Sequence, residues 1–219
     1  MKGYKRVAAY VDLDAIEDNF EAMKANLKEK TRIAAVVKAN GYGHGAAPIA
    51  RMIEKKDYLW GFAAATIEEA AELRRNGIQK PILILGYVFP EDYEELVRLD
   101  IRPTVFRLDM AKELSAEAVR QQKEVSVHIK VDTGMSRIGF ADTKESVQDV
   151  CAISKLPGIR MEGLFTHFAK SDELDKAATE KQLARYCAFR EACEAACVKF
   201  QIHHCSNSAG IIDLPEANL

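Results

Sequence analysis

The sequence predicts an α/β fold, a parallel (β/α)8 barrel, and three observations lead to this class. Seven short, near-continuous apolar runs alternate with helix-like segments, which is typical of a parallel sheet covered by helices. The runs start about 20 to 40 residues apart, the repeat length of a βα unit in such a barrel. No GxGxxG segment follows the first run, which removes one reason to prefer an open doubly wound sheet.

The predicted strands are rich in β-branched and aromatic residues. They cover residues 33–37, 59–63, 82–85, 103–106, 125–131, 159–166 and 201–205. A further apolar run, VAAYV at residues 7–11, precedes the first helix and is either an eighth strand or part of another sheet.

The predicted helices begin at recognisable capping residues. In the first helix, Asp14 and Glu17 have the spacing of a capping box. Its apolar face consists of Ile16, Phe20, Met23 and Leu27. A second box, Thr66 and Glu69, opens another helix, and Gly77 is its expected C-terminal stop. Similar helical periods start near Pro90, Asp109, Thr143 and Asp175.

Composition narrows the class of protein. The 219 residues are 48% hydrophobic, enough for a substantial core, and 31 basic against 33 acidic residues leave a net charge of −2. Without a long basic run, nucleic acids and acidic membranes are poor candidate partners. No stretch resembles a membrane span or a signal peptide, so we expect a cytoplasmic protein. The five cysteines are odd in number, which favours reduced thiols over a disulfide framework.

Polar residues follow four of the predicted strands, at the edge where barrel active sites collect. Lys38 ends the first strand; Lys130, Asp132 and Arg137 end the fifth; Thr166 and His167 end the sixth; Ser206, Asn207 and Ser208 follow the seventh. Taken alone, Lys38 could be a snorkelling lysine and His167 a hydrogen-bonded core histidine. Together they favour a site, because a desolvated lysine can form a Schiff base and the SNSAG segment suits a phosphate. This combination suggests pyridoxal 5′-phosphate (PLP) as the cofactor.

Four segments carry a resemblance to a known family. AVVKANGYGHG (35–45), KVDTGMSRIGF (130–140), GLFTHFAKSDE (163–173) and HCSNSAG (204–210) occur in the order found in the alanine racemase family of barrel-type PLP enzymes. The chain resembles that family over essentially its whole length. The resemblance implies a PLP-dependent isomerase that interconverts L- and D-alanine by a two-base mechanism and supplies D-alanine for peptidoglycan.

The resemblance also implies roles for residues around the cofactor. Lys38 matches the lysine that holds PLP as an imine and exchanges the α-proton on one face of the substrate. Tyr42, Asn207 and Ser208 match contacts to the phosphate. Gly41 and Gly43 let the backbone turn tightly after Lys38, so that Tyr42 can reach that phosphate.

A second group of implied roles concerns the substrate. His167 matches a histidine beside the cofactor, and Arg137 matches an arginine that bonds the phenolic oxygen of PLP and the substrate carboxylate. Met135 lies near that carboxylate in the family. Lys130 matches a lysine that is often carbamylated, which would replace its repulsion of Arg137 by attraction.

The same resemblance implies parts that we do not find in the sequence. We expect residues 1–219 to form one PLP-binding barrel domain that ends before the eighth strand and lacks the family's C-terminal β domain. Residues 1–11 would form a strand that pairs with that domain. The second base, a tyrosine from the other subunit of a homodimer, is also absent, so we expect the 219-residue chain alone to be inactive.

Other interpretations stay open at this stage. The chain could belong to a serine/alanine racemase within a larger resistance protein, to a non-catalytic, single-domain PLP-homeostasis protein, or to a barrel that binds other phosphorylated ligands without an imine. A metal site is disfavoured, although Cys193, Cys197, His203, His204 and Cys205 lie close in sequence. Neighbouring strand residues point to opposite faces, so these side chains converge poorly, and we predict no metal.

Overall fold

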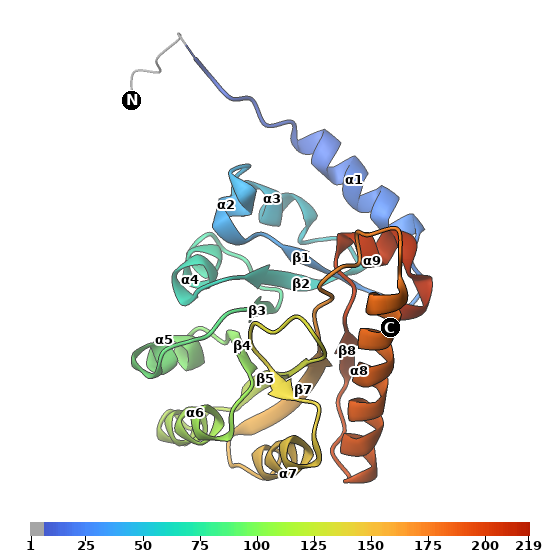
Figure 1. Ribbon diagram of the computed structural model, residues 1–219. Coiled ribbons are helices and arrows are strands. Elements are labelled where there is room, and N and C mark those ends of the chain that lie inside the picture. The colour runs from blue at the N-terminus through green and yellow to red at the C-terminus, as the bar shows by residue number, and fades with distance from the viewer. Residues whose placement is uncertain (1–6) are drawn as a thin grey trace.

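The computed structural model describes residues 7–219, which form one sheet of parallel strands (Figure 1). The strands are β1 (Ile33–Val36), β2 (Leu59–Ala64), β3 (Ile82–Ile84), β4 (Arg102–Val105), β5 (Val125–Asp132), β6 (Phe140–Ala141), β7 (Ile159–Phe165) and β8 (Ile202–His204). Their order in the sheet is β1-β2-β3-β4-β5-β7-β8, and β6 pairs with β5 off this path. The predicted parallel β/α barrel is confirmed, here as a half-barrel whose outer strands are β1 and β8.

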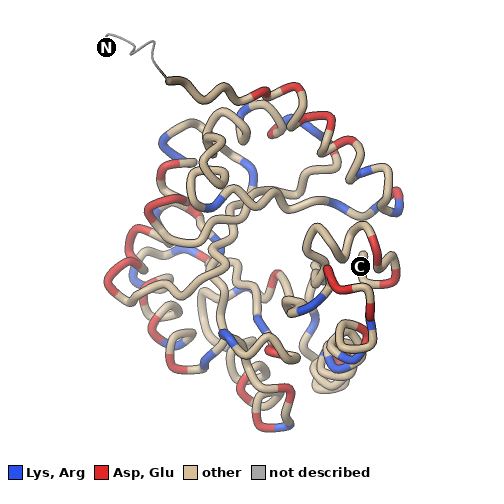
Figure 2. Tube along the Cα trace, turned by 45° about the horizontal axis from the view of Figure 1, so that its top comes forward, with Lys and Arg blue, Asp and Glu red and all other residues tan. Residues whose placement is uncertain are grey.

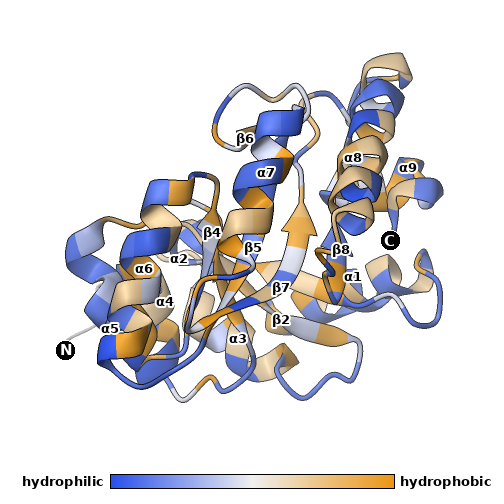
Figure 3. Ribbon diagram, turned by 90° about the horizontal axis from the view of Figure 1, so that it is seen from below, coloured by the Kyte–Doolittle hydropathy of each residue, from blue (hydrophilic) through white to orange (hydrophobic). Residues whose placement is uncertain are grey.

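Helices follow the strands and cover the outer face of the sheet (Figure 3). They are α1 (Leu13–Ala25), α2 (Lys38–Tyr42), α3 (Ala46–Ile53), α4 (Ile67–Arg75), α5 (Tyr93–Arg98), α6 (Leu108–Arg120), α7 (Lys144–Ile153), α8 (Ala177–Ala195) and α9 (Ser208–Asp213), with short 3-10 turns at Pro90–Asp92 and Pro215–Ala217. The amphipathic pattern explains their placement, since α4 buries Ile67, Ala70, Ala71 and Leu73 and exposes Glu68, Glu72 and Arg75.

The predicted helix starts are partly confirmed. Thr66 caps α4 and Thr143 caps α7, each through its hydroxyl oxygen. The capping box predicted at Asp14 is wrong, because Asp12 has the extended backbone of a cap and its carboxylate accepts from the amide of Ala15 at 3.1 Å. Asp14 instead lies in the first turn, where its negative charge favours the helix N-terminus.

The N-terminal run differs from one of its two interpretations. Residues 7–12 pair with no strand of the described sheet, and Val7 and Tyr10 are 89% and 95% exposed. These residues are therefore not the eighth strand of this barrel. Residues 1–6 of the predicted strand lie outside the described part of the chain, and pairing of residues 1–11 with a further domain stays a prediction.

The strand β6 was not predicted. It has two residues, Phe140 and Ala141, which pair with Val131 and Asp132 at the end of β5. A pair of residues carries too little alternation to be recognised as a strand from sequence. Its effect is to return the loop that contains Arg137 to the rim of the sheet.

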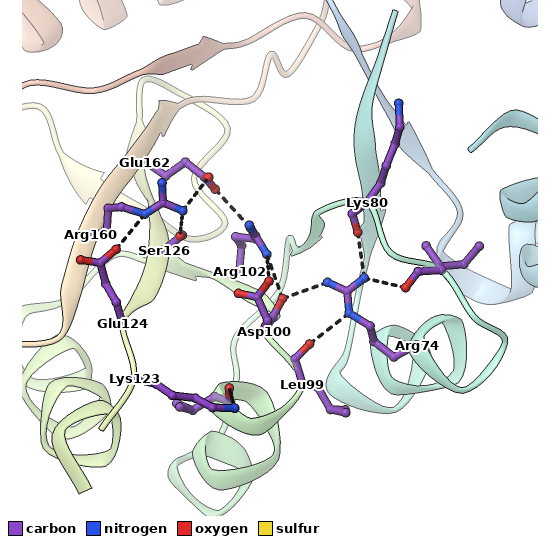
Figure 4. A network of polar contacts seen from close by, with 12 residues as sticks. Arg74, Lys80, Leu99, Asp100, Arg102, Lys123, Glu124, Ser126, Arg160 and Glu162 are labelled. Atoms are coloured by element: carbon purple, nitrogen blue, oxygen red, sulfur yellow. Dashed lines mark hydrogen bonds and ion pairs between the residues drawn. The ribbon is translucent and has the colours of Figure 1, made fainter. Parts of the chain in front are cut away.

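The interior of the half-barrel contains buried charged groups as well as apolar ones (Figure 4). Glu162 is 6% exposed and its carboxylate meets Arg102 at 3.3 Å, His128 at 3.2 Å and Arg160 at 3.3 Å. Burial raises the pKa of Glu162, but the hydrogen bond from His128 and the charge of Arg102 outweigh it and lower the pKa overall. The carboxylate is therefore ionised in a region from which water is largely excluded.

Two buried histidines extend this network. Burial lowers the pKa of both His128 and His204, so both rings are neutral near pH 7. If Nε2 of His128 donates to Glu162, its Nδ1 must accept, and His204 Nε2 lies 2.9 Å from that atom. The network thus assigns one direction to the hydrogen bonds, from His204 through His128 to Glu162.

Charge is spread over the outside of the molecule. Acidic and basic residues alternate along the helices and loops, as Figure 2 shows. Within residues 7–219, we find no helix with the length and apolar character needed to cross a membrane.

Candidate functional site

Lys38 lies at the rim formed by the carboxyl ends of the strands. β1 ends at Val36, Val37 still donates its amide to the carbonyl of Ala63 in β2 at 2.9 Å, and Lys38 begins α2. The ammonium of Lys38 lies 5.9 Å from the centroid of the Tyr42 ring. Lys38 is half-buried and Tyr42 is 60% exposed, so a ligand can reach both side chains.

Three basic residues converge on one histidine. Burial, together with the charges of Arg137, Lys130 and Lys38, lowers the pKa of His167 to about 4. These cations come from the ends of β1 and β5 and from the loop after β5, whereas His167 follows β7. The structure therefore brings together four residues that the sequence had placed at the ends of three different strands, and it keeps His167 neutral near pH 7.

Lys130 is the most buried of the four. It is 2% exposed, and its ammonium lies 5.6 Å from the centroid of the Phe165 ring. Burial and the charge of Arg137 lower the pKa of Lys130 to about 8, against the opposing charge of Asp132. Among residues 7–219, no carboxylate lies within 4.0 Å of this ammonium, so the lysine is set beside a like charge without a partner.

The loop that carries Arg137 and Met135 is held from both ends. At its start, the Asp132 carboxylate accepts from the amides of Gly134 at 2.8 Å and Ser136 at 3.0 Å. Met135 is half-buried, whereas Arg137 is exposed and free to meet a ligand.

Helix α8 fixes the same loop from outside. Arg185 binds both carboxylate oxygens of Asp142 at 2.6 Å and donates to the carbonyl of Thr133 at 2.8 Å. The buried Gln182 donates to the Thr133 hydroxyl at 3.3 Å and to the carbonyl of His167 at 3.2 Å. Sequence reasoning missed these residues, because nothing in a helical pattern distinguishes them from other polar positions of α8.

Asn207 and Ser208 lie at the start of α9. Asn207 is its N-cap, and its side-chain oxygen accepts from the amide of Gly210 at 3.0 Å and from the hydroxyl of Ser171 at 2.7 Å. Among residues 7–219, no hydrogen bond joins Tyr42 to Asn207 or Ser208. Residues that bind different oxygens of one phosphate need not bond each other, so the role of these three residues stays a prediction.

Glu69 is a further residue whose contact with the site the sequence did not reveal. Its carboxylate accepts from the amide of Ala39, directly after Lys38, at 2.7 Å, and from the amide of Ala65 at 2.7 Å. The capping-box spacing had identified Glu69 as part of the start of α4. Its reach to a loop 30 residues earlier depends on the pairing of β1 with β2.

The residues gathered at the rim, Lys38, Lys130, Arg137 and His167, fit an anionic aldehyde cofactor such as PLP. The amine of Lys38 can form an imine, and the neighbouring cations at the rim favour the negative charges of a phosphate or carboxylate. The fit depends on the buried Lys130, which is 2% exposed and has no carboxylate of residues 7–219 within 4.0 Å of its ammonium, and on the exposed guanidinium of Arg137 in the following loop.

Comparison with known proteins gives an independent result. Residues 11–219 match the family model described as "Alanine racemase, N-terminal domain". The chain is 41% identical over 211 residues to an alanine racemase of Desulforamulus reducens, covering 96% of this chain and 57% of that protein. It is 45% identical over 213 residues to an alanine racemase of Clostridium perfringens, covering 97% and 55%.

Solved structures agree. The fold matches the alanine racemase of Clostridium difficile 630 in complex with cycloserine, with a TM-score of 0.94 and 41% identity, over 95% of this chain and 57% of that one. The chain thus spans little more than half the length of the curated relatives that it matches.

Proposed function

The chain belongs to the alanine racemase family, as its N-terminal domain, and from this premise we propose that it forms the PLP-binding barrel of an enzyme that interconverts L- and D-alanine. The observation that carries the proposal is the group of cations at the rim, Lys38, Lys130 and Arg137, whose charges all act on His167. Such an arrangement is costly unless an anion completes it.

We assign the cofactor to residues of the rim. Lys38 would hold PLP through its amine, His167 would lie beside the ring, and Tyr42, Asn207 and Ser208 would bind the phosphate. A neutral His167 supports this assignment, because a further cation next to Lys38 would oppose imine formation. When bound, PLP supplies an electron sink that stabilises negative charge at the substrate α-carbon.

The remaining residues bind the substrate and move its proton. Lys38 Nζ takes or returns the α-proton on one face, and Arg137 holds the substrate carboxylate through its exposed guanidinium. Met135 borders the same position in the loop. Carbamylation of Lys130 would place a negative group beside Arg137 and fix its orientation.

The activity of the whole protein belongs to the same proposal. A second base on the opposite face would be a tyrosine from the C-terminal domain of a partner subunit, which makes the enzyme a homodimer. We place it in the cytoplasm, where D-alanine would enter peptidoglycan synthesis.

Reductive trapping tests the assignment. After incubation of the full-length enzyme with PLP and reduction with borohydride, mass spectrometry should find the pyridoxyl group on Lys38. Lys38→Ala should abolish this label, whereas Lys112→Ala, a substitution of an exposed lysine on α6, should leave it unchanged. A label on any other lysine, with Lys38 unmodified, contradicts the proposal.

The substrate is tested separately by solvent exchange. In D2O with PLP, the full-length enzyme should exchange the α-proton of alanine through Lys38, and loss of this amine should slow exchange by roughly 10²- to 10⁴-fold. Exchange of serine at the same rate as alanine would favour the serine/alanine racemase interpretation.

A further inference from the structure

The turn after Lys38 has an unusual backbone. Ala39, Asn40 and Gly41 have φ values of 51°, 51° and 63°, and Tyr42 has a φ of 54°, so consecutive residues are left-handed. For residues other than glycine this conformation costs about 1–2 kcal/mol each. The turn is therefore a strained element that other contacts must hold in place.

Some of these contacts lie within the turn. Gly41 donates to the carbonyl of Val37 at 2.8 Å, and the Asn40 side chain accepts from the amide of Ala46 at 3.0 Å. Neither contact holds the peptide group that joins Lys38 to Ala39. That peptide group determines ψ of Lys38 and hence where the turn starts relative to the lysine.

Glu69 from α4 holds this peptide group. One carboxylate oxygen accepts from the amide of Ala39 at 2.7 Å, and the other accepts from the amide of Ala65 at 2.7 Å. Both distances are those of charge-assisted hydrogen bonds. Since Ala65 follows β2 and Ala39 lies just beyond β1, the carboxylate joins the ends of two neighbouring strands.

Helix capping alone does not explain this geometry. In a capping box, the glutamate side chain returns to the amide of its own cap residue, here Thr66. The Thr66 hydroxyl does accept from the Glu69 amide, at 3.5 Å, but the Glu69 carboxylate is directed to Ala39 and Ala65 instead. Helix α4 and the turn α2 lie side by side at the ends of β1 and β2 (Figure 1).

We propose that Glu69 is a positioning residue for Lys38: its carboxylate fixes the peptide that follows the lysine and so directs the Lys38 amine toward the cofactor. This inference rests on the proposed function, because it assigns to Glu69 the placement of the reactive amine. Glu69 does not itself touch the reacting atoms.

The first arm of the test measures the anchor without cofactor. In the full chain, amide hydrogen exchange by NMR should be at least tenfold faster at Ala39 and Ala65 in Glu69→Ala than in the unchanged protein. Glu69→Gln keeps one acceptor oxygen and should give an intermediate result. The matched control is Glu68→Gln, which removes a carboxylate from the same helical turn and should leave both amides unchanged.

The second arm measures the lysine. At a temperature where all variants are folded by circular dichroism, Glu69→Ala should lower borohydride-trapped pyridoxyl at Lys38 and the accompanying visible absorbance at least tenfold. Glu69→Gln should restore part of both signals, and Glu68→Gln should match the unchanged protein. A merely structural role would lower the melting temperature of Glu69→Ala but leave its labelling at Lys38 intact.

The outcomes separate this inference from the proposed function. Unchanged exchange at Ala39 in Glu69→Ala overturns the inference, and so does faster exchange with full labelling at Lys38. If the unchanged protein takes no label at Lys38, the proposed function fails, whereas the exchange arm still reports on the anchor.

Discussion

Replacing Glu162 by alanine removes the buried carboxylate that lies between Arg102 and Arg160 in Figure 4. The Glu162 side chain is 7% exposed and meets the side chains of Arg102, His128 and Arg160. Truncation leaves the Arg102 guanidinium, whose side chain is 11% exposed, with the exposed Asp100 as its remaining carboxylate, at 2.8 Å. We therefore expect a large loss of folding stability.

The magnitude follows from burial. Removing one partner of a buried ion pair costs about 3–5 kcal/mol, and the remaining contact with Asp100 places the loss at about 3 kcal/mol. Glu124 offers a matched control, because it pairs with the same Arg160, at 3.1 Å, but its side chain is 61% exposed. Glu124→Ala should cost less than about 1 kcal/mol.

Urea unfolding measures both losses. The single tryptophan, Trp60, has its ring centroid 5.3 Å from that of His128, so its fluorescence reports on this part of the core. At a slope of about 1–3 kcal/mol per molar urea, Glu162→Ala should lower the midpoint by about 1–3 M. If Glu162→Ala and Glu124→Ala lower the midpoint equally, burial of the network does not determine its contribution and the reasoning is refuted.

Three further predictions concern the same chain. Folding stability should fall as the pH is lowered from about 6.5 to 4. Burial lowers the pKa of His128 and His167 in the folded protein, so the unfolded chain binds protons at a higher pH. Urea midpoints that stay constant over this range would contradict this prediction. Lys130, whose pKa is about 8, should react with CO2 to form a carbamate and release a proton. With ¹³C-bicarbonate, NMR should show a new carbonyl signal that is absent from Lys130→Ala. Absence of this signal from the unchanged protein at neutral pH would speak against the modification. Gly163→Ala should destabilise the fold by about 1–3 kcal/mol, because the added carbon would overlap the buried His128 ring. A melting temperature equal to that of the unchanged protein would exclude this clash.

The strands could be predicted because burial on both faces leaves a direct signature in sequence. The run from Val125 to Val131 has a β-branched residue at every second position, and the observed β5 differs from it by a single residue. The left-handed turn after Lys38 could be predicted only in part. Glycines indicated a tight turn, but Ala39 and Asn40 also have positive φ values, and the amide of Ala39 is held by Glu69, 30 residues away.

The candidate site was predicted from strand ends alone, since parallel strands carry their last residues to one rim. This explains why Lys38, Lys130 and His167 could be placed together from the sequence. The residues that hold them could not be found in this way. Glu69 and Arg185 act across 30 and 43 residues of chain, and their partners are backbone groups or a carboxylate in a loop.

Asn207 illustrates a different limit. The motif SNSAG indicated a side-chain amide that binds a phosphate. In the structure, the side-chain oxygen of Asn207 caps α9 by accepting from the amide of Gly210, and it also accepts from the hydroxyl of Ser171. The same residue type serves both purposes, because each needs a polar side chain next to free backbone amides. Sequence pattern cannot distinguish them without the position of the helix.

Helix α8 joins two loops that are far apart in the chain. Gln182 contacts both the Thr133 hydroxyl after β5 and the His167 carbonyl after β7. Arg185 binds Asp142, which follows β6 at the far end of the loop that contains Arg137. Local opening of α8 would therefore release the Arg137 loop and the His167 segment in a single event. Their backbone amides should exchange with one common free energy of opening, so that this half of the rim behaves as one cooperative unit.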